Sequence, residues 1–550
     1  MSSDEKKKKG LTRRDFVKGT AAGVAGGLVA GAAGTALAAQ KAQPKPWLPA
    51  KWDYKADMIV LGAGSAGQMA AIEAHDKGAK VLLVEMAPSP YFSESSCCGG
   101  LASVPRNPMQ IKEGILDDSP DLLYEDMMKV GQYSNRTDIL RLFVDNELEA
   151  FTRFWELGAK PITNSFLAGH SRKRTVAHLN RQCQEALYDQ IKKRGISTLF
   201  NTRATRLVTD YPAGRVLGIE AMQGVTPPDY KGGKKIFIQG KVTVLATGGM
   251  CGSPEMLKKY APRVEALAAW AEPGPPGTLK IPEGPARPLG LGDGYKMGMA
   301  IGADTTHMYC ITMYTGTPVG PDAPGYGRTY TPTFKTMLDD TFYNAIAVNK
   351  EGKRFISEYR ALCDVGEAMV QQPGKFLCVI ADKTLYDASV KANIMGLSPP
   401  RIIKLAEEGK IPVWFGNTIE ELAVKAGLDP AGLQKTVTNW NKYVDDGVDP
   451  EFGRSMKPPS RAYKILTPPF VAMKWVIVPL HNGGGLRANT RLQILDVYGN
   501  VIPGLYGAGE IIGGTCGEVY LSSTHWPVAV TFGYLVGKTF AIGEALAKKG

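Results

Sequence analysis

The stretch Asp57-Met-Ile-Val-Leu-Gly-Ala-Gly-Ser-Ala-Gly-Gln68 decides the fold of this chain. Its apolar run stops at a glycine, as a buried parallel strand does before a tight turn. Gly62, Gly64 and Gly67 have the spacing GxGxxG. The first glycine permits the turn, the second lets a pyrophosphate approach the backbone, and the third lets the next helix pack on the strand. The Ala-rich residues that follow predict a helix whose N-terminal amides face the phosphates.

A second strand, Lys80-Val-Leu-Leu-Val-Glu85, follows this helix. Glu85 ends it and is placed to accept hydrogen bonds from the ribose hydroxyls of an adenosine. Glycine-rich turns also occur without nucleotides, but here strand, glycines, helix, second strand and terminal acid arrive in order. The sequence therefore predicts a dinucleotide site, and this motif alone does not separate NAD from FAD.

The composition limits the class of protein. A chain of 550 residues is too long for one small core, so two or more domains are expected. With 44% hydrophobic and 21% charged residues it reads as an ordinary globular protein. The net charge of +12 favours an anionic partner or membrane surface, but no dense basic cluster indicates nucleic acid. The eight cysteines form no CxxC or CxxCH, so we expect no covalent haem, iron–sulfur cluster or other metal site.

The N-terminus predicts export. Thr12-Arg-Arg-Asp-Phe-Val-Lys18 matches the twin-arginine pattern, a Gly/Ala-rich segment follows, and Ala36-Leu-Ala38 offers a cleavage site. A transmembrane anchor is the alternative, but the apolar run is weak and barely long enough to span. Residues 1–38 are therefore predicted to be a signal peptide read by the twin-arginine export machinery. This places the protein in the periplasm or another extracytoplasmic space.

From about residue 55 onward the chain resembles the fumarate reductase/succinate dehydrogenase flavoproteins, especially flavocytochrome-type fumarate reductases and 3-ketosteroid dehydrogenases. The matching pieces are GAGSAG with Glu85, VTVLATGG at 242–249, GLGDGYKMGMAIGA at 290–303, NKEGKRFISE at 349–358 and NTRLQILDVYGNVIPGLYGAGEIIGG at 489–514. In this family the acid that ends the last piece, here Glu510, binds the ribityl chain of FAD. The resemblance therefore implies FAD rather than NAD.

The fold class that the resemblance implies is α/β: a Rossmann-like FAD-binding domain with an inserted α+β capping domain. The FAD-binding domain would comprise residues 57–305 and 471–550, the capping or substrate domain residues 306–470, and residues 39–56 would be a linker. The implied FAD-binding residues, with the glycines of the turn, are Gly62, Gly64, Ala66, Gly67, Glu85, Ser93, Gly99, Gly100, Ala204, Asp293, Glu510, His525 and Trp526. Tyr91-Phe-Ser93 stands where the family has Gly-Gly-Asn, so the contacts of that loop stay open.

The substrate site departs from the family pattern. Fumarate reductases hold a dicarboxylate with Arg and His side chains and use an arginine of the capping domain as proton donor. His481 matches the substrate-binding histidine, but Tyr520 replaces a family arginine and Tyr314 a family histidine. The proton-donor arginine falls on Leu362, with Arg360 two residues earlier.

These replacements change the ligand that the pocket suits. A bidentate arginine–carboxylate contact is among the strongest polar pairs, whereas a tyrosine gives one neutral hydrogen bond worth about 0.5–1.5 kcal/mol. We therefore expect a small apolar substrate that carries a carbonyl. Tyr520-Leu-Ser522 is similar to the Tyr-x-Ser of the 3-ketosteroid Δ4-dehydrogenases. Tyr520 and Ser522 would polarise the carbonyl oxygen, Tyr314 would move a proton and His481 would orient the substrate.

The leading hypothesis is an exported oxidoreductase that transfers hydride between flavin N5 and a carbon–carbon bond next to a carbonyl. It would reduce an α,β-unsaturated compound with electrons from a c-type cytochrome or a quinol-linked protein. One alternative runs in the oxidative direction as a 3-ketosteroid-type dehydrogenase. Another is a reductase of an aromatic acrylate that uses Arg360 or Arg328, and a third is a flavoprotein without turnover. The substrate, the direction, the redox partner and the oligomeric state stay open.

Overall fold

The structure, a computed structural model, describes residues 48–547 with gaps. The gaps are residues 99, 168, 211–213, 228, 264–277, 280–286, 289, 317–344, 361, 392–402, 405, 410–411 and 457–461. The predicted signal peptide, the first half of the predicted linker (residues 39–47), Gly99 and Arg328 lie outside the described residues.

The central sheet has the strand order β21-β22-β11-β2-β3-β7. Its strands are Met58–Leu61 (β2), Val81–Val84 (β3), Ser197–Leu199 (β7), Val242–Leu245 (β11), Gln493–Leu495 (β21) and Val501–Gly507 (β22). The pairs from β7 to β22 are parallel, and β21 is antiparallel at the edge. Every residue of β2, β3 and β11 is buried, which explains why these strands are continuous apolar runs. The predicted Rossmann-like fold is confirmed.

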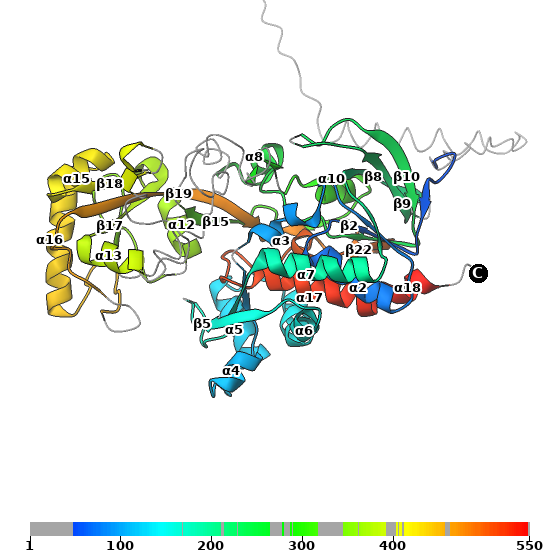
Figure 1. Ribbon diagram of the computed structural model, residues 1–550, viewed down its shortest axis with the longest axis horizontal. Helices are drawn as coiled ribbons and strands as arrows, with labels where there is room; N and C mark the ends of the chain where they lie inside the picture. The colour runs from blue at the N-terminus through cyan, green and yellow to red at the C-terminus, as the bar shows by residue number, and fades with distance from the viewer. Residues whose placement is uncertain are drawn as a thin grey trace, which may run out of the picture. The chain divides into compact units, whose positions relative to one another are not determined.

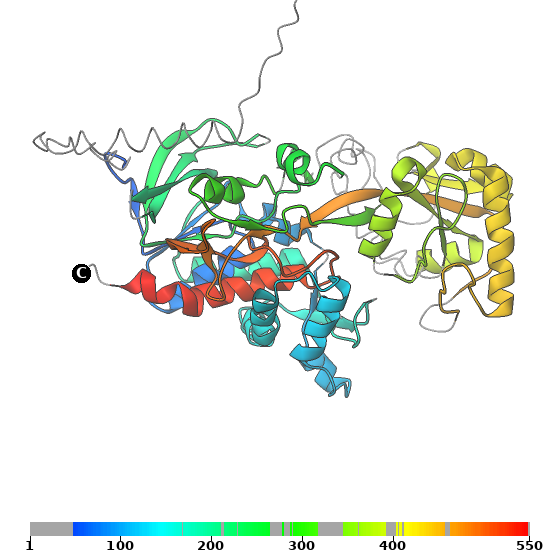
Figure 2. The same cartoon turned by 180° about the vertical axis from the view of Figure 1, so that it is seen from behind.

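Helices cover this sheet. They include α2 (Ser65–Asp76), α6 (Thr137–Glu156), α7 (Asn180–Lys193) and α17 (His525–Leu535), and α17 continues as a π-helical turn (Val536–Phe540) and α18 (Ile542–Leu546). Figures 1 and 2 both show α17 running beside α2, which it contacts. A side chain at Gly533 would collide with the Ala66 carbonyl, its Cβ only 2.3 Å from the oxygen. This close packing holds the last turn of α17 against the start of α2.

Smaller sheets flank the central one. Tyr54–Lys55 (β1), Lys234–Gln239 (β10), Arg215–Gln223 (β9) and Thr202–Asp210 (β8) form a sheet in that order, and its last three strands are the meander that follows β7. Leu101–Ser103 (β4), Thr175–His178 (β6) and Pro161–Ser165 (β5) form another. Two short pairs complete this part: Thr278–Leu279 (β12) with Arg287–Pro288 (β13), and Thr305–Thr306 (β14) with Gly485–Leu486 (β20).

The remaining helices and turns of this part are short. They are Pro90–Phe92 (η1), Glu94–Cys97 (α3), Pro108–Lys112 (α4), Pro120–Val130 (α5), Pro254–Tyr260 (α8), Asp293–Ala300 (α10) and Gly509–Ile511 (η3). Among the described residues, no helix is long and apolar enough to cross a membrane.

The inserted part is α+β, as predicted. Its sheet has the order β15-β19-β17-β16, with β18 also paired to β19. The strands are Ile311–Gly316 (β15), Ile346–Val348 (β16), Phe376–Ala381 (β17), Val413–Gly416 (β18) and Phe470–Asn482 (β19). The helices are Leu362–Val370 (α12), Lys383–Lys391 (α13), Ile419–Ala426 (α15) and Pro430–Asp446 (α16), with a 3₁₀ turn at Pro373–Lys375 (η2). The domain boundaries stay a prediction, and β19 runs across the one proposed at residue 470.

Candidate functional site

The dinucleotide turn has the geometry that its glycines predict. Gly62 has φ +104°, and a Cβ there would lie 2.2 Å from the Ala246 carbonyl oxygen. A Cβ at Gly67 would lie 1.8 Å from the Gly62 carbonyl oxygen. At Gly64 the nearest atom is a side-chain hydroxyl oxygen, that of Ser95, at 3.2 Å. Backbone contacts thus hold strand, turn and helix close together, while a Cβ at Gly64 would meet only side-chain atoms.

Glu85 follows β3 and lies beside this turn. Its two carboxylate oxygens accept hydrogen bonds from the amides of Ala63 (2.7 Å) and Ala87 (2.8 Å). Burial raises the pKa of Glu85 above its ordinary value, against the lowering effect of these amides. Because a carboxylate oxygen accepts more than one hydrogen bond, Glu85 can also receive the ribose hydroxyls that the sequence predicts for it.

The loop after η1 brings Ser93 and Gly100 to the same region. Ser93 begins α3, and its Cβ lies 3.7 Å from the position of a Cβ at Gly64. Gly100 has φ +71°, and its carbonyl accepts a hydrogen bond from the His178 amide (2.7 Å). The predicted contact at Gly99 lies outside the described residues.

Ala204 and Asp293 line one cavity between β8 and α10, with a volume of about 860 Å³. Asp293 is the first residue of α10 and accepts two hydrogen bonds from the Arg203 guanidinium (2.7 and 2.8 Å). Two residues that the resemblance assigns to FAD, 89 positions apart, therefore border the same space.

Glu510, in η3, is the centre of a buried hydrogen-bond network. Its Oε1 accepts a hydrogen bond from the Asn482 amide (2.9 Å), and its carbonyl accepts one from the Tyr295 hydroxyl (2.7 Å). The Asn482 side chain donates to that hydroxyl (2.7 Å) and accepts from the Met250 amide (2.9 Å). Strand β19, helix α10 and the turn after β11 are thus tied to one carboxylate.

A second carboxylate, Glu94 of α3, lies against Glu510. Its Oε2 accepts a hydrogen bond from the Gly249 amide (3.2 Å). Cβ atoms at Gly248 and Gly290 would lie 2.2 and 2.6 Å from Glu94 oxygens, and one at Gly249 would lie 2.2 Å from Glu510 Oε1. Burial, reinforced by the nearby Glu510, raises the pKa of Glu94 well above its ordinary value. Three glycines thus form a cradle that holds two acids.

These features fit FAD. The cofactor has ribose and ribityl hydroxyl donors, and the site offers Glu85 and Glu510 as acceptors. The turn at Gly62–Gly67 and the start of α2 suit a pyrophosphate. The three glycines of the cradle let both acids lie where a Cβ would collide with their oxygens.

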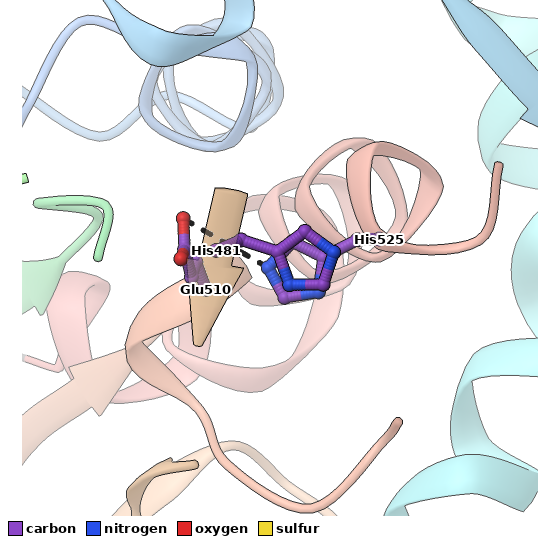
Figure 3. A group of neighbouring side chains, drawn as sticks. All are labelled: His481, Glu510 and His525. Atoms are coloured by element: carbon purple, nitrogen blue, oxygen red, sulfur yellow. Dashed lines mark ion pairs between the residues drawn. The ribbon is translucent and has the colours of Figure 1, made fainter. Parts of the chain in front are cut away.

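Beside Glu510, two histidines and a tyrosine form one contact group. The rings of His481 and His525 are stacked, with centroids 3.9 Å apart and planes 7° from parallel (Figure 3). Tyr520 lies edge-on to His481 with ring centroids 4.3 Å apart. His525 Nε2 lies 3.8 Å from Glu510 Oε2, and Nδ1 lies 3.4 Å from Cys516 Sγ. His481 is 7% exposed, and neither of its ring nitrogens has a hydrogen-bond partner among the described residues.

The ligand-type atoms of His481, Glu510 and His525 lie within 4.8 Å of one another, as metal ligands would. Imidazole donates its lone pair in the plane of the ring. Two nearly parallel rings stacked 3.9 Å apart have no point common to both planes, so they cannot both direct lone pairs at one ion. These three residues therefore suit a metal ion poorly, and their polar atoms suit a different kind of ligand.

The segment from Tyr520 to Thr524 is held from several sides. The Tyr520 hydroxyl accepts a hydrogen bond from the Ser523 amide (2.7 Å), and Ser523 has φ +69°. His170 Nε2 donates to the Ser522 carbonyl (2.9 Å), and the Ser103 amide donates to the Ser523 carbonyl (2.9 Å). This loop presents Tyr520 to His481. It also begins α17, where the Trp526 indole donates to the Ser65 hydroxyl (2.9 Å).

Two further residues, Tyr314 and Arg360, are also predicted to be catalytic. Tyr314 lies in β15, where it pairs with Val478 of β19, two strand positions from the Thr312–His481 pair. Its side chain lies outside the described residues, as does that of Leu362. Arg360 is exposed and lowers the pKa of Asp364, which burial raises. The structure therefore brings His481, Tyr520, Glu510 and His525 together, and it places Arg360 at the surface.

Three residues of the site were not predicted: Glu94, Asn482 and Cys516. Each is next to or near a predicted one in sequence, since Glu94 follows Ser93, Asn482 follows His481, and Cys516 lies in the loop that leads to Tyr520. Only their convergence on Glu510 and His525 gives them a role, and no sequence spacing encodes that convergence.

A family model described as "FAD binding domain" matches residues 57–523. A fumarate reductase (cytochrome) of Shewanella frigidimarina is 28% identical over 520 residues, which cover 92% of this chain and 80% of the relative. The open form of a flavocytochrome c3 fumarate reductase has a TM-score of 0.69 at 26% identity, covering 99% of this chain and 84% of the other. Relatives at 25–28% identity are named urocanate reductase, acrylate reductase flavoprotein subunit and digoxin reductase.

A 3-ketosteroid Δ4-(5α)-dehydrogenase of Rhodococcus jostii shares the fold, with a TM-score of 0.68 at 23% identity and coverage of 91% and 99%. The predicted resemblance and its cofactor are confirmed. The chain belongs to the FAD-binding-domain family of fumarate reductase-like flavoproteins, binds FAD and is an oxidoreductase that acts on carbon–carbon bonds.

Proposed function

We propose that this protein reduces the carbon–carbon double bond of an α,β-unsaturated carbonyl compound that carries its carbonyl on an apolar body. The observation that carries this proposal is the unsatisfied, buried imidazole of His481, which lies against Tyr520. A buried polar group without a hydrogen bond is costly, so a ligand that supplies a polar atom there is favoured.

The charge of the site favours a neutral oxygen over a dianion. Burial and the nearby His525 lower the pKa of His481 well below its ordinary value, so His481 is neutral. Tyr520, which offers a hydroxyl group, stands where the family pattern has an arginine. Neutral donors hold a carbonyl oxygen well, but they lack the charge-assisted contacts that a dicarboxylate needs.

When bound, FAD supplies the hydride for the β-carbon. The protein would do the rest: Tyr520 and Ser522 stabilise the negative charge that develops on the substrate oxygen, and His481 orients it. Because the Ser523 amide donates to the Tyr520 oxygen, the hydroxyl proton of Tyr520 can be directed toward a ligand. Tyr314 is proposed to move the proton at the α-carbon.

The donor of electrons is proposed to be a c-type cytochrome or a quinol-linked protein, in keeping with the cytochrome-linked relatives. The export signal in residues 1–38 supports a periplasmic or other extracytoplasmic location, where NAD(P)H is absent. Both proposals rest on sequence.

Reoxidation of the reduced holoenzyme tests the substrate class. The FAD-loaded protein is reduced chemically without oxygen, and the return of the oxidised flavin spectrum is followed with four compounds: a cyclic enone, a 3-ketosteroid enone, an aromatic acrylate and fumarate. We expect the enones to reoxidise the flavin at least tenfold faster than fumarate. Faster reoxidation by fumarate would overturn the proposal, and a preference for the acrylate would replace it with a monocarboxylate reductase. Reduction of the oxidised enzyme by a saturated 3-ketosteroid would reverse the proposed direction.

A further inference from the structure

His525 is the buried imidazole that has acidic partners at both nitrogens. Nδ1 faces the Cys516 sulfur at 3.4 Å, and Nε2 faces the Glu510 carboxylate at 3.8 Å. Its side chain is 12% exposed. A carboxylate can only accept hydrogen bonds, so Nε2 suits these surroundings best when it carries an N–H group.

The titratable groups around His525 come from several elements. Glu510 lies in η3, Cys516 in the following loop, His481 in β19 and Tyr520 just before α17, and Glu94 of α3 touches Glu510. Burial and the nearby His525 lower the pKa of His481, and burial and Glu510 raise the pKa of Glu94. The ion pair among these groups is the one between His525 and Glu510.

The same contacts set the protonation of His525. Burial would lower its pKa, but the Cys516 sulfur and Glu510 together outweigh burial and raise the pKa of His525 to about 10. A cation therefore persists there at neutral pH. By contrast, His170 and His178, which are buried without a carboxylate at either nitrogen, have pKa values lowered to about 4.

We propose that His525 compensates the charge of Glu510 in the cofactor bed, and so keeps the reduction potential of bound FAD above the value that an uncompensated carboxylate would impose. The physical reason is that reduction adds negative charge to the cofactor, and a buried carboxylate beside it opposes that addition. A cation that neutralises the carboxylate removes this opposition. The inference rests on FAD lying at Glu510, and it does not depend on the substrate.

Anaerobic redox titration against a reference dye tests the proposal in the FAD-loaded protein at pH 7. We expect His525→Gln to weaken the preference for reduced over oxidised FAD about tenfold, a fall in midpoint potential of about 30 mV for a two-electron couple. His75→Gln, at the far end of α2, is the control and should leave the potential unchanged. An unchanged potential in His525→Gln would overturn the proposal.

A double-substitution cycle shows whether Glu510 is the partner. In a Glu510→Gln background, His525→Gln should no longer lower the potential, because no carboxylate is left to compensate. A full effect in that background would overturn the assignment of Glu510. A purely structural role for His525 would lower stability in both backgrounds without moving the potential.

NMR of histidine-labelled wild-type holoenzyme measures the protonation of His525 directly. This test does not require that the variants bind FAD. The chain has six histidines, so the imidazole signals are few. We expect the His525 signal, identified by its absence from His525→Gln, to stay in the protonated position at pH 8. A neutral His525 at that pH would overturn the proposal even if the variants lost FAD. Failure of the enone experiment would leave this result untouched.

Discussion

Two buried clusters of polar and charged side chains in this protein differ in how completely their hydrogen-bonding atoms are paired. In the capping part, Arg354 donates to Glu358 (2.8 and 2.9 Å) and Asp449 (2.9 and 3.1 Å), and Arg454 donates to Glu358 (3.1 Å). All four side chains are at most 1% exposed. The tryptophan ring of Trp440 lies 4.8 Å from the guanidinium carbon of each arginine. In the cofactor part, and among the residues that the structure describes, His481 has no hydrogen bond and His525 Nε2 has only a 3.8 Å contact with Glu510.

The difference separates structure from function. A cluster whose donors and acceptors match completely has no capacity left for a ligand, and its charges serve the fold. A cluster with unsatisfied nitrogens beside a carboxylate is costly in the empty protein and gains when a polar ligand enters. Arg354 and Glu358 lie in the NKEGKRFISE motif, so part of the family resemblance reflects packing of the capping part rather than catalysis.

Breaking the satisfied cluster should give the largest effect on stability. Arg354→Met leaves Glu358 and Asp449 buried with only Arg454 to pair them, and removal of one partner of a buried ion pair costs about 3–5 kcal/mol. Urea unfolding of the holoenzyme measures the loss. Lys353→Met, the neighbour whose side chain is 63% exposed, is the matched control and should unfold like wild type. A stable Arg354→Met protein would show that this cluster does not support the fold.

A buried acid that belongs to neither cluster, Glu147 of α6, sharpens the comparison. Its side chain is fully buried, and neither oxygen has a hydrogen-bond partner among the described residues. Burial raises its pKa well above the ordinary value, so the folded protein keeps a proton that the unfolded chain releases above about pH 4.5. Wild type therefore loses stability as pH rises through this window, while Glu147→Gln does not.

The expected advantage of Glu147→Gln grows by about 1.4 kcal/mol for each pH unit over which only the folded state holds the proton. The advantage should stop changing with pH below about pH 4.5, as the unfolded chain also takes up the proton. Urea unfolding of both proteins between pH 4.5 and 8 checks this, with Glu149→Gln on the exposed side of α6 as control. A difference that does not change with pH would contradict a protonated Glu147.

Tyr520→Phe tests the substrate side of the unsatisfied cluster. It should lower the rate of reoxidation by an enone at least tenfold, about 1.4 kcal/mol, because the hydroxyl no longer stabilises the substrate oxygen. The FAD content should be unchanged. The control is Tyr534→Phe, which removes a hydroxyl of α17 that donates to Glu149. This variant should keep full activity. Equal rates in the two variants would show that the Tyr520 hydroxyl does not stabilise the substrate oxygen.

The smallest effect is expected at His170, which holds the loop rather than the substrate. His170→Gln weakens the bond to the Ser522 carbonyl, worth about 0.5–1.5 kcal/mol. We expect KM for the enone to rise a few-fold while kcat changes less, measured by steady-state kinetics with a chemical electron donor. A fall in kcat alone would mean that His170 acts on the reacting atoms.

Much of the cofactor half follows from sequence, because its signals are local. The GxGxxG turn requires glycine where a Cβ would collide with backbone, and Glu85 must end β3 to reach it. The substrate half is harder to predict. His481 and Tyr520 are separated by 39 positions, and their contact depends on β19 and the Tyr520–Thr524 loop meeting at Glu510. Nothing in the sequence around Glu94 indicates a buried acid.

The sequence by itself determined that a buried parallel strand, a glycine turn and a helix would receive a dinucleotide, because the apolar run, the GxGxxG spacing and the Ala-rich segment are local signals that arrive in order. Only the tertiary structure decided the charges in the site. Whether His481, His525, Glu94 or Glu510 carries a charge depends on burial and on neighbours brought from distant elements. These are properties of the folded site and not of the residues themselves.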